Sequence, residues 1–176
     1  MRAINEVFHD GEIKAQTQFN DSAQEGAVLL KRINRMYLTA LNEPCIDFLK
    51  KQTFFFIATS NPKGECDCSF RGTEMDENNT LYESLKILGK NQLVFPDYTG
   101  NNMYNSLGNI ISNPNIGMLF IDFNKASRLR VNGVATIIDN KESFEDIWPM
   151  AHRYITVDIK SVFWNCSRRI KESVNL

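Results

Sequence analysis

The sequence predicts a mainly β fold with flanking helices, in which six or seven antiparallel strands form a barrel. Runs of β-branched and aromatic residues recur from residue 53 onward, as in Thr53–Thr59 and Ile116–Phe123, and such runs are typical of strands. Turn residues such as those of Ser60–Gly64 separate them, which favours hairpins and antiparallel pairing. An uneven set of short strands avoids open edges by closing into a barrel.

The 176 residues contain no repeat, low-complexity segment or linker. We therefore expect a single domain over 1–176, with a helical N-terminal extension over about 1–52 that begins as an extended arm or a loose terminus at 1–20. Helical apolar spacing predicts helices over residues 22–38, 43–52, 103–112 and 140–153. Alternating or continuous apolar runs predict strands over residues 53–59, 65–70, 81–88, 92–95, 116–123, 128–137 and 154–164, with a polar loop over 72–80.

The composition is that of a soluble globular protein, with 43% hydrophobic and 23% charged residues and a net charge of −1. No block of like charge occurs, which argues against a dominant nucleic-acid or membrane surface. The N-terminus lacks the apolar core of a secretory signal and no run could span a membrane, so we expect a cytoplasmic protein. The 12 phenylalanines fit either a barrel core or an apolar dimer face.

The four cysteines are expected to be free thiols, as in other cytoplasmic proteins. Cys66 and Cys68 form a Cys-x-Cys pair, but the chain has only two histidines and no zinc-ligand spacing, so no metal is expected. Because side chains alternate along a strand, Cys66, Cys68 and Phe70 share one face. We expect that face to be the core if the strand lines the barrel.

The stretch from Gln92 to Leu107 reads QLVFPDYTGNNMYNSL. A strand over Leu93–Phe95 is stopped by Pro96, and a Gly/Asn turn leads into a helix expected to begin at Met103. Free N–H groups and the positive dipole end at such a helix start can bind an anion. The alternative is an ordinary strand–turn–helix with a good cap.

Several segments resemble the pyridoxamine 5′-phosphate oxidase-like, FMN-binding split-barrel family over roughly residues 50–170. The resemblance rests on the order and spacing of Leu93–Met103, Leu107–Ile110, Asn113-Pro114, Gly117–Phe123, Arg130–Ala135, Asp67–Gly72 and Val162–Cys166. It implies a split barrel and a homodimer with two FMN sites in the interface cleft.

The resemblance also implies a set of cofactor-binding residues. The FMN phosphate would lie at Gly100, Asn101, Asn102 and Met103, with Asp97 and Tyr98 near the ring system. Ser69, Phe70 and Arg71 would pass beside the flavin, and Arg128 and Arg130 would face the cofactor of the same or the partner subunit.

The chain departs from this family at one point, because relatives usually carry a basic residue where it has Asn102 or Met103. A phosphate dianion favours charge-assisted donors, best supplied by a forked arginine. Arg71 or Arg130 must then supply the charge, or FMN binding is weaker than in relatives.

Two functions of different classes follow from the resemblance. The first is an FMN-dependent oxidoreductase acting on an unknown small molecule, in which FMN carries the redox chemistry. No Ser-His-Asp set is evident, and His152 falls in an expected helix. The second is a flavin-binding module without turnover, such as an electron carrier, sensor or storage protein. A third interpretation is a split barrel for another ligand, such as haem or F420.

Overall fold

The computed structural model describes residues 8–19 and 36–165. The chain divides into two units, Met1–Leu38 and Thr39–Leu176. In the first unit the described elements are helix α2 (Asp10–Phe19) and the short strand β1 (Tyr37–Leu38).

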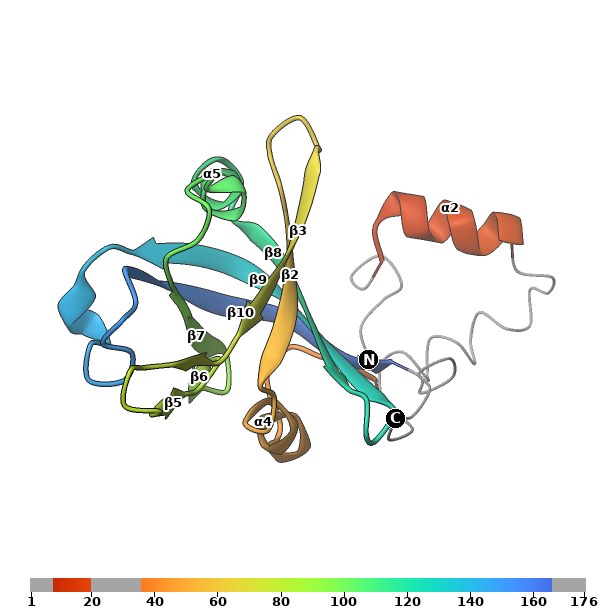
Figure 1. Cartoon of the computed structure of the whole chain (residues 1–176). Coiled ribbons are helices and arrows are strands. Elements are labelled where there is room, and N and C mark those ends of the chain that lie inside the picture. The colour runs from red at the N-terminus through yellow and green to blue at the C-terminus, as the bar shows by residue number, and fades with distance from the viewer. Residues whose placement is uncertain (1–7, 20–35, 166–176) are drawn as a thin grey trace, which may run out of the picture. The chain divides into compact units, whose positions relative to one another are not determined.

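The second unit is an antiparallel sheet with two short helices. Its strands are β2 (Phe54–Ser60), β3 (Cys66–Gly72), β4 (Glu74–Met75), β5 (Leu81–Tyr82), β6 (Lys86–Gly89), β7 (Gln92–Asp97), β8 (Asn115–Asp122), β9 (Ser127–Ile138) and β10 (Arg153–Asn165). Helices α4 (Glu43–Leu49) and α5 (Asn105–Ser112) lie at opposite ends of the sheet (Figure 1). The predicted mainly β, antiparallel fold class is confirmed.

The strands of this sheet follow the order β3-β2-β8-β9-β10-β7-β6, and β4 pairs separately with β5. The two end strands, β3 and β6, have no pairing with each other among the described residues, so the sheet curls without closing. Long β9 and β10 form its longest ladder, with a register shift between Ile159 and Ser161.

The core is built from the strand faces that point inward. In β2, Phe55 and Ile57 are buried while Phe54 and Phe56 are only partly covered, which is the two-residue period of a strand. The ring of Phe55 packs against Phe95 of β7 and Phe120 of β8, with centroids 5.4 and 5.0 Å apart. A second cluster joins Val94, Trp148, Ala151 and Tyr154.

The prediction that Cys66, Cys68 and Phe70 of β3 face the core is wrong, because all three residues are exposed. Arg71 and Ser69 stand opposite Phe55 and Ile57 of β2, and directly opposed residues lie on the same side of a sheet. The inner side of β3 is therefore the polar one, which lines a cavity instead of the packed core.

The N-terminal predictions have mixed outcomes. The expected extended arm is wrong over Asp10–Phe19, which forms α2; the Glu12 side chain accepts from the backbone N–H of His9 three residues earlier, half of a capping box. The helix expected over 22–38 falls mostly outside the described residues, and at its end Tyr37–Leu38 is extended.

Three predicted elements between residues 72 and 153 also need correction. The strand expected over 81–88 is two strands, β5 and β6, and β5 pairs with β4 inside the expected loop. The helix expected from Met103 begins at Asn105. The helix expected over 140–153 is a single 3₁₀ turn, η1 (Lys141–Ser143), because Trp148 packs into the second cluster and donates to the carbonyl of Glu83 at 2.7 Å.

Candidate functional site

A polar cavity of about 640 Å³ opens between β3, the end of β7, the start of α5 and the start of β10. Its volume lies in the range of small-molecule sites. The lining residues come from segments far apart in the sequence: Asp67, Ser69, Phe70, Arg71, Gly72, Thr73, Glu74, Ser84, Pro96, Asp97, Tyr98, Thr99, Gly100, Asn101, Asn102, Tyr104, Asn105, Ser106, Leu107, His152 and Arg153.

One wall of the cavity, formed by β3, is hydrogen-bonded to Ser106 at the start of α5. The Ser106 hydroxyl donates to Oδ2 of Asp67 at 2.9 Å and lies 2.8 Å from the hydroxyl of Ser69. Because a serine hydroxyl has one proton, Ser69 must be the donor in the second bond. Ser69 Oγ therefore keeps acceptor capacity for an N–H or O–H of a ligand.

Arg71, on the same wall, is a cation without a counterion. Its Nη1 donates to the carbonyl of Phe70 at 2.8 Å, while its Nε is buried without a partner, and no carboxylate of residues 8–19 or 36–165 forms an ion pair with it. Burial lowers the pKa of Arg71, and the charges of Asp97 and Asp67 oppose this effect. Arg71 as a whole is half-buried, and a partly desolvated cation of this kind is stabilised when an anion pairs with it.

The start of α5 forms the neighbouring wall. Its N-cap residue, Tyr104, is left-handed at φ 54° and gives no side-chain cap, and the first helical bond runs from Gly108 N–H to the Tyr104 carbonyl at 2.7 Å. The N–H groups of the three residues before Gly108, Asn105 to Leu107, have no intrahelical acceptor. All three residues line the cavity.

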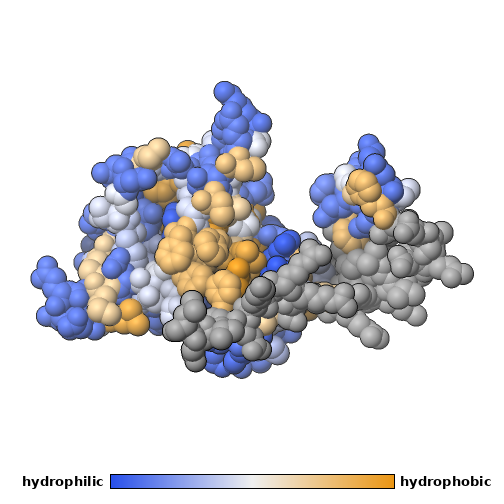
Figure 2. Space-filling view, turned by 45° about the vertical axis from the view of Figure 1, so that its right-hand side comes forward, coloured by the Kyte–Doolittle hydropathy of each residue, from blue (hydrophilic) through white to orange (hydrophobic). Residues whose placement is uncertain are grey.

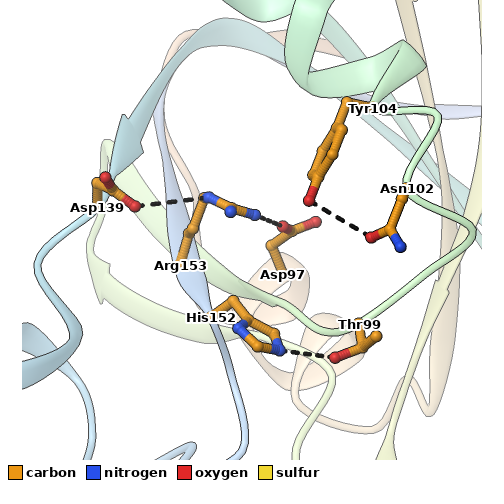
Figure 3. A network of polar contacts seen from close by, with 7 residues as sticks. All are labelled: Asp97, Thr99, Asn102, Tyr104, Asp139, His152 and Arg153. Atoms are coloured by element: carbon orange, nitrogen blue, oxygen red, sulfur yellow. Dashed lines mark hydrogen bonds and ion pairs between the residues drawn. The ribbon is translucent and has the colours of Figure 1, made fainter.

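Across the cavity, the loop after β7 is held by polar contacts (Figure 3). Arg153 Nη1 lies 3.0 Å from Oδ2 of Asp97, its Nε lies 3.5 Å from Asp139, and its guanidinium carbon lies 5.4 Å from the Tyr104 ring centroid. His152 Nε2 is 2.6 Å from the Thr99 hydroxyl.

Tyr98 places a second unpartnered group beside the cavity. Its hydroxyl is buried without a hydrogen bond, and its ring packs against the second core cluster, which contains Trp148. Burial raises the pKa of Tyr98, and the charge of Glu74 raises it further. Tyr98 therefore remains neutral and can act as a donor or an acceptor for a ligand.

Eight of the eleven residues predicted to bind the cofactor line this one cavity: Ser69, Phe70, Arg71, Asp97, Tyr98, Gly100, Asn101 and Asn102. Their role towards FMN stays a prediction. The ring of Phe70 is turned outward, where it stacks on Phe54.

The other three predicted residues lie away from the cavity. Met103 is 67% exposed, Arg128 lies on β9 opposite Ile121 and Asn165, and Arg130 lies over the ring of Phe163 at 5.6 Å. Whether they face the cofactor of a partner subunit stays a prediction.

Sequence reasoning missed four of the polar lining residues, Asp67, Ser106, His152 and Arg153. The alternation Asp67-x-Ser69-x-Arg71 could have revealed Asp67, since the three share a strand face. Nothing local marks His152 and Arg153, because the fold brings them to Thr99 and Asp97 from more than fifty positions away.

Within residues 8–19 and 36–165, no group of three or more His, Cys, Asp or Glu side chains could hold a metal ion, and Cys45, Cys66 and Cys68 are free thiols. None of the helices in the described part of the chain is long and apolar enough to cross a membrane.

A family model described as pyridoxamine 5′-phosphate oxidase matches residues 41–170. The chain belongs to the pyridoxamine 5′-phosphate oxidase family. This is a flavin-related oxidoreductase family, and the fold is its split barrel. No curated protein gives a significant match.

Solved structures support this fold. A candidate pyridoxamine 5′-phosphate oxidase from Lactobacillus delbrueckii superposes with a TM-score of 0.55 at 18% identity, over 72% of this chain and 95% of that one. HupZ of Group A Streptococcus superposes with a TM-score of 0.54 at 15% identity, over 70% of this chain and 93% of that one. Such low identities show the fold alone.

Proposed function

We propose that the chain binds FMN in this cavity and is an FMN-dependent oxidoreductase acting on a small molecule. One observation carries the proposal: the unpaired Arg71 guanidinium shares a cavity of ligand size with the uncapped start of α5. Both features favour a phosphate group. The residues present therefore fit FMN, although the usual basic residue at Asn102 or Met103 is missing.

In this proposal the chain's own residues bind and orient the cofactor. Arg71 and the α5 N–H groups hold the phosphate, and Ser69 and Tyr98 offer hydrogen bonds to polar groups of the flavin. When bound, FMN supplies the electron transfer that the protein side chains cannot.

A flavin-binding module without turnover is the second candidate. Most ionisable groups in the cavity are already engaged: Asp67 with Ser106, Asp97 with Arg153, and His152 with Thr99. A site that moved substrate protons would need an acid or base within reach of the substrate. Bleaching of the bound flavin by NADH or NADPH supports the oxidoreductase, and a flavin that stays oxidised with both supports the module.

The phosphate contact is tested by measuring FMN and riboflavin affinities of Arg71→Ala by fluorescence titration. Loss of a charge-assisted contact costs about 1.5–3 kcal/mol, so FMN should bind about tenfold to a hundredfold more weakly. Riboflavin lacks the phosphate and should bind almost unchanged.

Arg130→Ala is the matched control, since Arg130 is exposed and lies off the cavity. Equal losses for FMN and riboflavin in Arg71→Ala would mean that Arg71 supports the fold. A loss of FMN affinity in Arg130→Ala instead would transfer the phosphate contact to Arg130.

We propose in addition that the chain is a cytoplasmic homodimer. The free thiols favour a reducing compartment. An aromatic patch formed by Phe54, Phe56, Phe70 and Phe123 favours a partner surface, because its rings lie 5.6–6.3 Å apart and two of them are more than 40% exposed. Figure 2 shows hydrophobic side chains gathered on one face of the molecule.

A further inference from the structure

Asp97 and Arg71 carry opposite charges and line the same cavity, yet no ion pair joins them. Asp97 and Asp67 are the two carboxylates whose charges act on Arg71, and both raise its pKa. Neither forms an ion pair with it, and Arg71 Nε stays buried without a partner.

Both carboxylates are engaged elsewhere. Asp67 accepts the hydrogen bond of Ser106 at 2.9 Å, and Asp97 is bound by Arg153 at 3.0 Å. The Asp97 side chain is only 13% exposed, so a free carboxylate there would need a counterion.

Strand register fixes the Asp97–Arg153 pair. Arg153, the first residue of β10, stands directly opposite Asp97, the last residue of β7, and the N–H of His152 donates to the Asp97 carbonyl at 2.9 Å. Asp139 and the Tyr104 ring hold the arginine from its other sides. Arg71 lies on β3, at one end of the strand order, whereas Asp97 and Arg153 lie on the paired strands β7 and β10 near the other end, and all three residues line the cavity.

We infer that Arg153 is a positioning residue, whose ion pair with Asp97 keeps that carboxylate off Arg71 and leaves the Arg71 guanidinium open to an anionic ligand. The inference rests on the proposed phosphate contact of Arg71. It assigns Asp97 a role different from contact with the flavin ring: Asp97 is the competitor that Arg153 neutralises.

The test compares Arg153→Met, Asp97→Asn and the double variant by FMN and riboflavin titration. Methionine keeps much of the arginine stem without its charge, so packing is disturbed little. We expect Arg153→Met to lose about tenfold or more in FMN affinity, because the freed Asp97 carboxylate captures Arg71. Asp97→Asn should bind FMN as tightly as the wild type or more tightly, and the double variant should bind like Asp97→Asn. Riboflavin affinity should stay constant throughout.

Two results would overturn the inference. One is a double variant as weak as Arg153→Met, because Arg153 would then contact the ligand or support the fold. The other is a loss of FMN affinity in Asp97→Asn, because Asp97 would then help binding. If Arg153→Met does not fold, as judged by circular dichroism, Asp97→Asn has to bind FMN more tightly than the wild type for the inference to stand.

A measurement without ligand separates this inference from the proposed function. In the NMR spectrum of the free protein, the Nε–H of Arg71, assigned with Arg71→Lys, should exchange more slowly with water in Arg153→Met and return to the wild-type rate in the double variant. An unchanged Arg71 signal contradicts the inference, whatever FMN does. Wild-type protein that binds FMN no better than riboflavin contradicts the phosphate contact instead.

Discussion

Tyr98 carries a buried hydroxyl without a hydrogen-bond partner beside a cavity of ligand size. Leaving such a group unsatisfied costs about 1–3 kcal/mol, so a folded protein that retains it either accepts the cost or recovers it with a ligand. Removal of the Tyr98 hydroxyl should therefore maintain or raise the stability of the ligand-free protein and lower its affinity for the ligand.

Tyr98→Phe should leave the ligand-free protein as stable as the wild type at pH 7, or more stable by up to about 1–3 kcal/mol. The same variant should bind FMN more weakly if the hydroxyl contacts it. Urea unfolding and FMN titration measure the two effects, and a clear destabilisation at pH 7 would show that the hydroxyl is satisfied in solution.

The pH dependence of the same variant has a defined sign. Because the folded-state pKa of Tyr98 is raised, the folded protein keeps its full stability with respect to this group below the ordinary tyrosine pKa of about 10. It loses stability as the pH rises from there towards the raised value, because the unfolded chain ionises first. Wild-type stability should thus fall above about pH 10, and Tyr98→Phe should fall less steeply.

At the scale of the element, β2 separates the two environments of the barrel. Phe55 and Ile57 face the core, and their neighbours Phe54 and Phe56 face outward. The inward set is closely packed, since Phe55 contacts rings from both β7 and β8.

Phe55→Ala should therefore destabilise the protein by about 3–5 kcal/mol, the usual cost of emptying a core phenylalanine site. Ile111→Ala on α5 is the control, because Ile111 is 78% exposed and a surface change is expected to stay within about 0.5 kcal/mol. Urea unfolding at pH 7 gives both values, and equal effects would contradict the assigned inner face.

The elements that were predictable from the sequence are those whose residues carry their own pattern. The predictions of strands at Thr53–Thr59 and Ile116–Phe123 are confirmed by β2 and β8. Runs of apolar residues this dense have to be buried, so their own sequence is enough to indicate a core strand. The helix expected over 140–153 fails because Trp148 and Tyr154 pack with residues of other segments, and local spacing cannot show such contacts.

The candidate site was predictable to a similar extent. The resemblance pointed to both strand β3 and the loop after β7, which the fold brings to one cavity. It could not show that Asp97 is bound by Arg153, since that contact depends on the register of β7 with β10. It also could not show that α5 begins at Asn105, because Tyr104 adopts a left-handed backbone that is rare for tyrosine.

At the scale of the whole molecule, the aromatic patch of Phe54, Phe56, Phe70 and Phe123 makes assembly testable. Light scattering should give about twice the 20.2 kDa chain mass, and Phe123→Glu should shift the protein towards the monomer because a charge enters an apolar contact. Ile111→Glu is the matched control on α5. A wild-type monomer, or a dimer unaffected by Phe123→Glu, would contradict this surface.

The open seam of the barrel has a further consequence. β3 stands at one end of the strand order and β7 stands next to the other end, so within residues 8–19 and 36–165 no ladder pairs β3 directly with β7. A ligand that contacts both β3 and the end of β7 would link these two strands across the open side of the barrel. By mass action, it would raise the free energy of unfolding by about 2.7 kcal/mol at a hundred times its dissociation constant. The cofactor would then be a structural component of the barrel, and the loss of bound flavin would loosen the edge strand that carries Asp67, Ser69 and Arg71.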